Sequence, residues 1–252
     1  MLLVLVGCQS PAAAPEDLDS LTANLFTQFE SEAATLESAM DNLSDRLREL
    51  EASAELDDRS FSLTPLQASA LEGLEHPGRE LGDLTTYGLV YDSRFPVEVH
   101  IPSLLLDDLT ELSLTATTYD RTITEPEDPC CFQELRCDLM RTENHIIREQ
   151  LLYTLDYQQR KDYRWVMLED GQQALISRGW LPESAHGAAG QNHIYQSFDL
   201  EAWIPAGDRT IRYFALYTEF DYVGVSTEVA RSISLSATDA ALANVDDYLE
   251  GQ

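Results

Sequence analysis

The sequence predicts an α+β fold: an antiparallel sheet, a long helix after it at the C-terminus and a long helix before it at the N-terminus. Strand-like segments recur beyond Cys131, and short polar turns such as Asp170-Gly171 join most of them, so successive strands are expected to pair as hairpins. The last segment, 225–249, contains no Gly or Pro, and its apolar residues fall four apart. That spacing is typical of an amphipathic helix. They are Val225, Val229, Ile233, Ala237, Ala241 and Val245.

An apolar stripe in the N-terminal part of the chain predicts one long helix over residues 18–60. No Gly or Pro interrupts Leu18 to Leu56, and from Phe29 to Leu50 the apolar residues alternate in steps of four and three. At 1.5 Å per residue the helix would reach roughly 60 Å. Two arrangements are open: the helix lies on its own globular domain, or residues 18–56 self-associate as a coiled coil. The strongly acidic surface of the helix favours the first, because like-charged parallel helices repel each other at low salt.

Residues 61–94 are expected to form a connector with a short helix, and residues 95–252 the globular domain. Thr64-Pro65-Leu66-Gln67 has the pattern of a helix start, and His76-Pro77-Gly78 that of a stop. Val97 to Pro102 alternates apolar and polar residues like a strand, and Leu104 to Leu114 follows as a helix. Six further strands are expected at 132–140, 145–157, 163–169, 173–181, 193–205 and 210–222.

This order of elements resembles the helix-grip fold of the START and polyketide cyclase superfamily, also called SRPBCC. Val97–Pro102 followed by Leu104–Leu112 is similar to its first strand and helix, and Trp203-Ile204-Pro205 followed by Thr210–Leu216 to its last hairpin. The likeness spans about residues 95–250. It implies a curved seven-stranded antiparallel sheet around the long C-terminal helix, enclosing a cavity for an apolar small molecule or lipid.

Alternation along two strands gives the candidate ligand-binding residues. In 145–157 one set of alternate positions is mostly apolar and includes Glu149, Leu151 and Tyr153; in 193–205 the apolar set includes Gln196 and Phe198. We take these sets as the inner face and add Ile233 from the C-terminal helix. A buried polar group needs a partner, so Glu149 and Gln196 are expected to orient the polar end of a ligand. The alternative for Glu149 is a place at the sheet edge beside Arg148 or Arg164.

The N-terminus carries the pattern of a bacterial lipoprotein. Residues 1–8 form an apolar run ending in Leu5-Val6-Gly7-Cys8, which resembles a lipobox and implies lipidation of Cys8. The run is shorter than usual and no basic residue precedes Cys8, so we expect the natural start to lie upstream. Residues 9–17, with two prolines, are expected to form a tether. The implied location is the bacterial cell envelope, lipid-anchored at the outer membrane facing the periplasm. The alternative is a cytosolic N-terminus with a chance cysteine.

Composition excludes some classes of partner. The chain of 252 residues has 16 basic and 45 acidic residues and a net charge of −29, so binding to nucleic acid is not expected. No run of about eighteen apolar residues is present that would span a bilayer.

Residue patterns for chemistry are weak. There is no Gly-x-Ser-x-Gly elbow, phosphate-binding Gly loop or His-Glu-x-x-His helix, so no catalytic residue, cofactor or metal site is predicted and enzyme activity is not favoured. His186 and His193, with Glu183, have poor spacing for a metal. If 132–137 is extended, Cys131 and Cys137 lie about 20 Å apart, so free thiols or an intermolecular bond are expected at Cys130, Cys131 and Cys137.

Three functions therefore remain open. The favoured one is a lipid-anchored protein that binds an apolar ligand in a helix-grip cavity without chemistry. The second is an envelope interaction or spacer lipoprotein acting through its long helix, and the third is a cyclase-like enzyme. An interior filled by Trp165, Trp180 and Trp203 would argue against the first and third.

Overall fold

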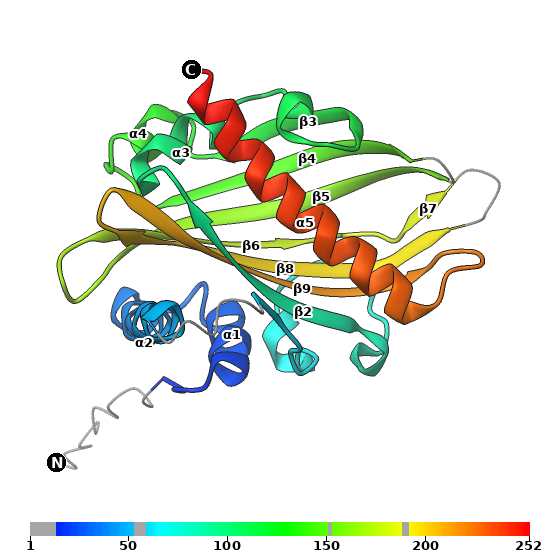
Figure 1. Cartoon of the computed structure of the whole chain (residues 1–252), viewed down its shortest axis with the longest axis horizontal. Helices are drawn as coiled ribbons and strands as arrows, with labels where there is room; N and C mark the ends of the chain where they lie inside the picture. Colours follow the sequence, from blue (N-terminus) through cyan, green and yellow to red (C-terminus); the bar gives the residue numbers. More distant parts are fainter. Residues whose placement is uncertain (1–13, 53–58, 151–152, 188–191) are drawn as a thin grey trace, which may run out of the picture.

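The chain folds around one large antiparallel sheet (Figure 1). In this computed structural model, residues 14–52, 59–150, 153–187 and 192–252 are described. Nine strands are found within them, and eight follow the order β1-β2-β9-β8-β6-β5-β4-β3, while β7 pairs with β5 and β8. They are β1 (Ser60–Phe61), β2 (Thr85–Ser93), β3 (Ala116–Glu125), β4 (Leu139–Gln150), β5 (Tyr153–Met167), β6 (Gln173–Trp180), β7 (Ala185–Gly187), β8 (His193–Ala206) and β9 (Arg209–Asp221).

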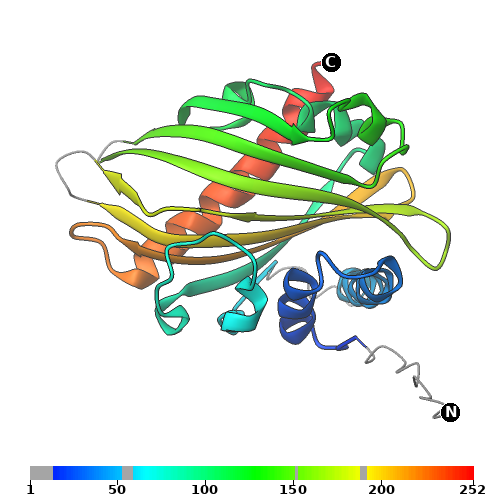
Figure 2. The same ribbon diagram turned by 180° about the vertical axis from the view of Figure 1, so that it is seen from behind.

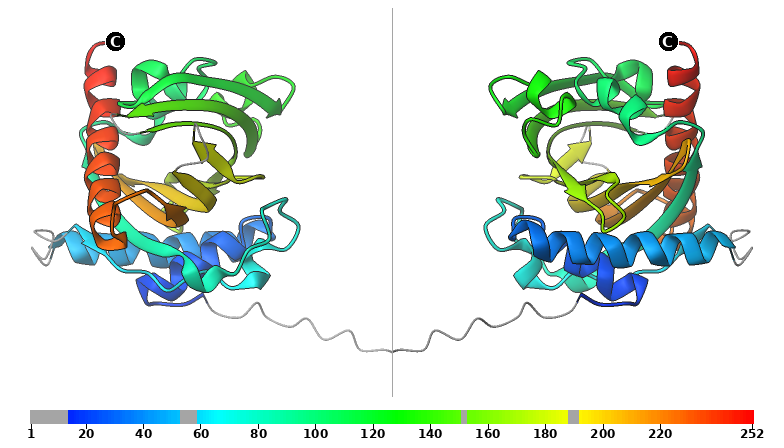
Figure 3. Two further views of the ribbon diagram at one scale, coloured as in Figure 1. Left: turned by 90° about the vertical axis from the view of Figure 1, so that its right-hand side faces the viewer. Right: turned by 90° about the vertical axis from the view of Figure 1, so that its left-hand side faces the viewer.

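The helices occupy both sides of the sheet. The sheet curves, with the C-terminal helix α5 on its concave side and the N-terminal helices α1 and α2 on its convex side (Figure 3). We call these the inner and outer faces. Among the described residues, none of the helices is both long and apolar enough to cross a membrane. The α-helices are α1 (Leu18–Thr27), α2 (Ala33–Ala52), α3 (Val97–Leu104), α4 (Cys130–Gln133) and α5 (Thr227–Glu250), and the 3-10 turns are η2 (Ala68–Leu71), η3 (Leu81–Asp83) and η4 (Thr110–Leu112).

This architecture confirms the predicted α+β helix-grip fold, but the strands differ from those predicted. The described sheet has more strands than the seven expected, because β1 and β2 lie at the start of and within the segment read as a connector, and β3 and β7 fall where no strand was predicted. The strand predicted over 132–140 is instead α4 and a turn, and only its last two residues belong to β4. Residues 86–90 of β2 are buried on both faces, so the strand lacks the apolar–polar alternation that marks a half-exposed strand. The predicted strand 145–157 is instead the end of β4 and the start of β5, paired as a hairpin.

The start of the expected globular domain is helical rather than extended. Val97 to Leu104 forms α3, and Val97 and Ile101, four residues apart, are both buried on the inner face. A spacing of four places two side chains on one side of a helix, which the short alternating pattern concealed. The helix expected over Leu104–Leu114 is reduced to η4, and the one after Thr64 to η2.

The predicted long N-terminal helix breaks between α1 and α2. Arg164 of the sheet donates hydrogen bonds from Nη1 to the carbonyls of Phe29 and Ser31, at 2.8 and 2.9 Å. The Arg178 guanidinium lies over the Phe29 ring and pairs with Glu30. These contacts satisfy backbone carbonyls of the turn between the helices, and both halves lie on the sheet. The prediction of a continuous helix was therefore wrong.

The apolar stripe of these helices is buried within its own chain. Leu36, Met40, Leu43 and Leu47 are almost inaccessible and belong to a large cluster with the outer-face residues of β6, β8 and β9. Figure 2 shows α1 and α2 against this face from behind. The helix thus lies on its own domain, and the stripe proposed for self-association through residues 18–56 is already occupied.

Helix α5 confirms the predicted C-terminal helix but is rotated relative to the predicted stripe. Val229 and Ile233 are 52 and 53% exposed, whereas Asp246 is fully buried. Asp246 accepts hydrogen bonds from Ser93 Oγ at 2.6 Å and from the Arg94 backbone at 2.9 Å. The buried face of α5 consists of Ala230, Leu242, Asp246 and Leu249, and the hydrogen bonds of the Asp246 carboxylate offset the cost of burying it.

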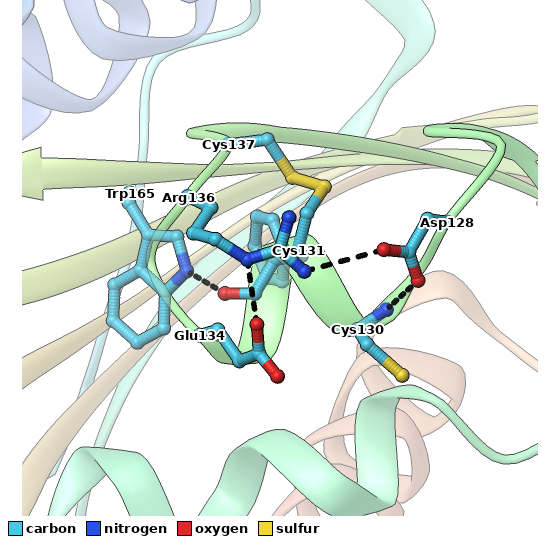
Figure 4. The surroundings of a disulfide bond; sticks show 8 residues. Asp128, Cys130, Cys131, Glu134, Arg136, Cys137 and Trp165 are labelled. Carbon is cyan, nitrogen blue, oxygen red and sulfur yellow. Dashed lines mark hydrogen bonds and ion pairs between the residues drawn. A yellow bond between two sulfur atoms is a disulfide. The ribbon is translucent and has the colours of Figure 1, made fainter.

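A disulfide links Cys131 and Cys137, contrary to the expectation of free thiols (Figure 4). The chain between them is not extended: α4 turns it, Leu135 adopts a left-handed conformation with φ of 56°, and the Cα atoms lie 5.4 Å apart. Figure 4 shows the Cys130 sulfur pointing away from the bond, and Cys130 is a free, exposed cysteine.

Candidate functional site

Many of the side chains on the inner face of the sheet are polar. Cross-strand pairing aligns the inward-pointing residues of β9, β8, β6 and β5 in three neighbouring rows. The rows are Leu216–Asp199–Gly179–Lys161, Phe214–Glu201–Ser177–Tyr163 and Arg212–Trp203–Leu175–Trp165. Apolar residues of the opposite parity face α1 and α2 on the outer side. The main core therefore lies outside the grip and polar groups lie inside it.

Four charged residues on this face form one network, which we call the inner-face cluster: Lys161, Asp199, Glu201 and Arg212. Lys161 Nζ lies 3.3 Å from Asp199 and 3.4 Å from Glu201. Arg212 donates to Glu201 through Nε, at 3.1 Å, and through Nη2. Because the pairs share Glu201, the four charges act as a unit with no net charge.

The network favours the charged forms of Lys161 and Glu201 despite their burial. Burial by itself lowers the pKa of Lys161, but the carboxylates of Asp199 and Glu201 raise that pKa above its ordinary value. Burial likewise opposes ionisation of Glu201, yet Arg212 and Lys161 hold its pKa below the ordinary value. The inner face is thus a fixed array of charges in a low-dielectric setting.

Gly179 makes room for this array. It lies between Asp199 and Lys161 in their row, and a Cβ at this position would overlap the Asp199 carboxylate. The absence of a side chain lets the Lys161–Asp199 pair form across β6. This explains a glycine in the middle of a buried strand, where it otherwise costs stability.

Four buried polar atoms on this face have no hydrogen-bond partner among the described residues. They are Ser177 Oγ, Asp199 Oδ1, Trp203 Nε1 and Arg212 Nη1, and of these Asp199 Oδ1 still lies 3.3 Å from Lys161 Nζ. Trp203 and Arg212 face each other across β8 and β9, with the guanidinium 5.4 Å from the indole ring centre. The indole and guanidinium nitrogens can only donate, so Trp203 and Arg212 each leave one donor here without an acceptor among the described residues.

A further positive charge lies on the same face. Arg121 of β3 is buried and donates to Asn144 Oδ1 at 2.9 Å, to the Tyr163 hydroxyl at 3.0 Å and to the Leu104 carbonyl at 2.5 Å. All three acceptors are neutral groups. Together with the neutral inner-face cluster, Arg121 gives this part of the sheet one positive charge in excess.

Apolar surface adjoins the polar groups. Phe214 and Leu216 lie next to Glu201 and Asp199 on the neighbouring strand and are only partly buried. The end of the grip beneath α3 and α4 is filled by an apolar cluster that includes Trp165 and Trp203, while Trp180 packs on the outer face. Trp165 and Trp203 thus close one end of the inner face, and Phe214 and Leu216 lie outside their cluster.

Ser93, His100 and Asp246 contain the residue types of a hydrolytic triad but not its arrangement. Ser93 Oγ lies 3.0 Å from His100 Nε2, and Asp246 bonds to the serine rather than to the histidine. All three are buried, and burial and the charge of Arg212 lower the pKa of His100 to about 4. The carboxylate therefore does not orient the imidazole as a triad requires, and its hydrogen bonds to Ser93 and the Arg94 backbone anchor α5 to β2.

A pocket of about 200 Å³ opens elsewhere, between α2 and the ends of β5 and β6. Its lining includes Leu36, Leu135, Arg164 and Met167. Arg164 there is already bonded to the carbonyls of Phe29 and Ser31. The inner face has the convergent unpaired donors that this pocket lacks and is the stronger candidate site.

The structure does not bring the predicted ligand-binding residues together. Glu149 is exposed, on the outer-face parity of β4, and Ile233 points to solvent. Gln196 is buried on the outer side, where it donates to the Glu80 carbonyl at 2.9 Å and to Glu219 at 3.0 Å. Phe198 packs edge-on against Phe26 of α1.

Three other predicted side chains lie outside the part of the chain that the structure describes. Leu151 and the lipidation residue Cys8 lie outside the described residues, as does the side chain of Tyr153 at the start of β5. The assignment of the apolar parity to the interior was the common error. The real inner face of β8 carries the other alternate set, which includes Ser197, Asp199 and Glu201.

Comparisons with known proteins find similarity only to solved structures, at low sequence identity. No protein-family model matches the chain, and no curated protein matches its sequence. A STAR-related lipid transfer protein from Xanthomonas axonopodis is 7% identical, with a TM-score of 0.45, over 69% of this chain and 97% of that one. The Zhui aromatase/cyclase from Streptomyces sp. R1128 is 9% identical, with a TM-score of 0.45, over 66% and 94%. Human StAR-related lipid transfer protein 5 is 12% identical, with a TM-score of 0.42, over 84% and 98%.

Proposed function

We propose that this chain is a binding protein, without chemistry of its own, that holds an amphipathic small molecule or lipid on the inner face of its helix grip. The polar end of the ligand accepts hydrogen bonds from Trp203 Nε1, Arg212 Nη1 and Ser177 Oγ. Its apolar part lies against Phe214 and Leu216. The observation that carries the proposal is the pair of buried donors on this face, Trp203 Nε1 and Arg212 Nη1, that have no acceptor among the described residues.

Charge favours an acidic polar end. A buried donor that finds no acceptor costs about 1–3 kcal/mol, so the site gains most from a ligand that offers several acceptor atoms. A carboxylate offers two oxygens and a negative charge, which suits the excess positive charge of Arg121. The apolar tail then contributes about 0.8 kcal/mol for each buried methylene.

We further propose that the protein acts in the bacterial cell envelope, anchored to the outer membrane through a lipidated Cys8. The lipobox-like sequence motivates this, and the Cys131–Cys137 disulfide adds support because such bonds persist in oxidising compartments. Labelling of cells with radioactive palmitate checks the anchor. The wild-type protein should take up label and Cys8→Ser should not; equal labelling of both would refute lipidation at Cys8.

Calorimetric titration tests the ligand class. The probes are palmitate and 1-hexadecanol, which share a sixteen-carbon chain and differ in the acidic group, added to the whole chain carrying Cys8→Ser. Palmitate should bind more tightly. Trp203→Phe keeps the ring but removes the donor and should weaken palmitate binding by about tenfold to about a hundredfold, the cost of one hydrogen bond to a charged acceptor.

Trp180→Phe is the matched control. Trp180 Nε1 is also buried without a partner among the described residues, but it lies on the outer face. This substitution should leave palmitate affinity unchanged. Failure of both probes to bind, together with native mass spectrometry showing an empty protein from its own host, would overturn the binding proposal. Equal losses of palmitate affinity in the two tryptophan variants would mean that the ligand does not bind at the inner face.

A further inference from the structure

Two histidines face each other at the rim of the sheet, away from the inner-face cluster. His186 of β7 and His193 of β8 are directly paired across the strands, and their Nδ1 atoms lie 2.8 Å apart. The two ring planes are inclined to each other at 75°. Each residue is at least partly exposed, which leaves the pair open to solvent ions.

The register places carboxylates at both ends of this pair. Asp156 of β5 is the cross-strand neighbour of His186, and Asp221 of β9 is that of His193. One row therefore reads Asp156–His186–His193–Asp221 across four strands. Asp156 is already bonded to His145 at 2.8 Å, whereas Asp221 is exposed beside His193. Carboxylates next to imidazoles, on a chain of net charge −29, favour the approach of a cation.

The spacing of the nitrogens suits a shared metal ion. Metal–imidazole bonds of 2.0–2.1 Å place two nitrogens on one ion roughly 2.9 to 3.4 Å apart for right-angled to tetrahedral geometry. A widening of a few tenths of an ångström from 2.8 Å reaches that range. The nearby Arg79, which lies over the Tyr195 ring, does not oppose this, because its charge is paired with Glu219.

We infer that His186 and His193 form a surface site for a divalent transition-metal ion that prefers nitrogen ligands, such as Cu²⁺, Zn²⁺ or Ni²⁺. Among the described residues no group of three or more His, Cys, Asp or Glu side chains is arranged to hold a metal, so water completes the coordination. Asp221, next in the row, strengthens the site by its charge. The site stands apart from the proposed ligand on the inner face.

Titration with Cu²⁺ tests the inference, because this ion binds imidazole most tightly in the divalent series and has a resolved paramagnetic spectrum. The whole chain is used without a polyhistidine tag. We expect one equivalent of Cu²⁺ to bind at pH 7.5, with hyperfine structure from two nitrogens, and to raise the melting temperature.

Matched variants assign the site. His186→Gln with His193→Gln should abolish the one-equivalent binding and the rise in melting temperature, and each single variant should remove one nitrogen from the spectrum. His76→Gln and His145→Gln are the controls and should bind Cu²⁺ like the wild type. Absence of binding by the wild type would overturn the inference. So would unchanged binding by a folded double variant, judged by circular dichroism.

Discussion

His100 is buried at the junction of β2, α3 and α5, where burial favours its uncharged form. Its Nε2 bonds to Ser93, and its Nδ1 has no partner in the described part of the chain. Burial, with the positive charge of Arg212, lowers the pKa to about 4, while the carboxylates of Asp246 and Glu201 act in the opposite direction. The residue is therefore neutral in the folded protein at any pH above that value.

The lowered pKa makes stability depend on pH. Unfolded histidine has a pKa near 6.5, so between that value and about 4 the unfolded chain binds a proton that the folded chain does not, and stability falls as the pH falls. Because only the unfolded chain takes up this proton, His100 should lower the free energy of unfolding by about 2 kcal/mol between pH 7 and pH 5. Urea unfolding at both pH values should show a smaller loss for His100→Gln than for the wild type. The surface variant His145→Gln serves as control, and equal losses in all three would contradict this account.

At the scale of elements, Arg178 joins the N-terminal helices to the sheet. It is buried, donates two hydrogen bonds to Asp162 at 3.2 and 3.0 Å, pairs with Glu30 and lies between the rings of Phe29 and Trp180. Burial raises the pKa of Asp162, and Arg178 is the principal charge that counters this rise. The break between α1 and α2 depends on this contact.

Arg178→Met should therefore destabilise the protein by about 3–5 kcal/mol, because it leaves the Asp162 carboxylate buried without its main partner. Hydrogen exchange should speed up in α1 and α2 before it does in β8 and β9. Arg141→Met is the control: Arg141 contacts the same Glu30 and Asp162 but is 38% exposed, so its loss should cost about 1 kcal/mol or less. A smaller loss for Arg178→Met than for Arg141→Met would show that the buried contact does not hold the helices.

The elements also show how much of the fold could be predicted from the sequence. Strands with one polar face, such as β8 and β9, and the uninterrupted α5 could be predicted, because period and length determine them locally. Strand β2 could not, since burial on both faces removes its alternation. The break at residues 28–32 depends on Arg164 and Arg178, more than a hundred residues away in the chain.

The candidate site could not be predicted from local sequence patterns, for a related reason. Alternation in β8 separates Phe198, Leu200 and Ala202 from Asp199 and Glu201, but it does not say which set faces α5. The expectation that apolar residues face the interior would hold for a sheet with one covered face. Here α1 and α2 cover the other face and take the apolar set, which leaves the charged set inside the grip.

At the scale of the whole molecule, the net charge of −29 sets how stability responds to salt. Buried pairs such as Lys161–Asp199 are poorly screened, whereas the excess carboxylates at the surface repel one another over distances that salt shortens. Self-repulsion of the compact state should therefore weaken as salt is added. Raising sodium chloride from about 10 mM to about 500 mM should increase stability by about 1–2 kcal/mol, equivalent to roughly 3–6 °C in melting temperature.

Scanning calorimetry at pH 7 measures this directly, and the same salt series near pH 4.5 is the control. As carboxylates take up protons near that pH, the surface charge falls, so the gain from salt should shrink. A melting temperature that falls with salt at pH 7 would mean that exposed ion pairs such as Arg94–Asp247 and Arg136–Glu134 contribute more to stability than the repulsion takes away. The sign of the salt effect thus decides whether the acidic surface weakens the fold or is offset by its own arginines.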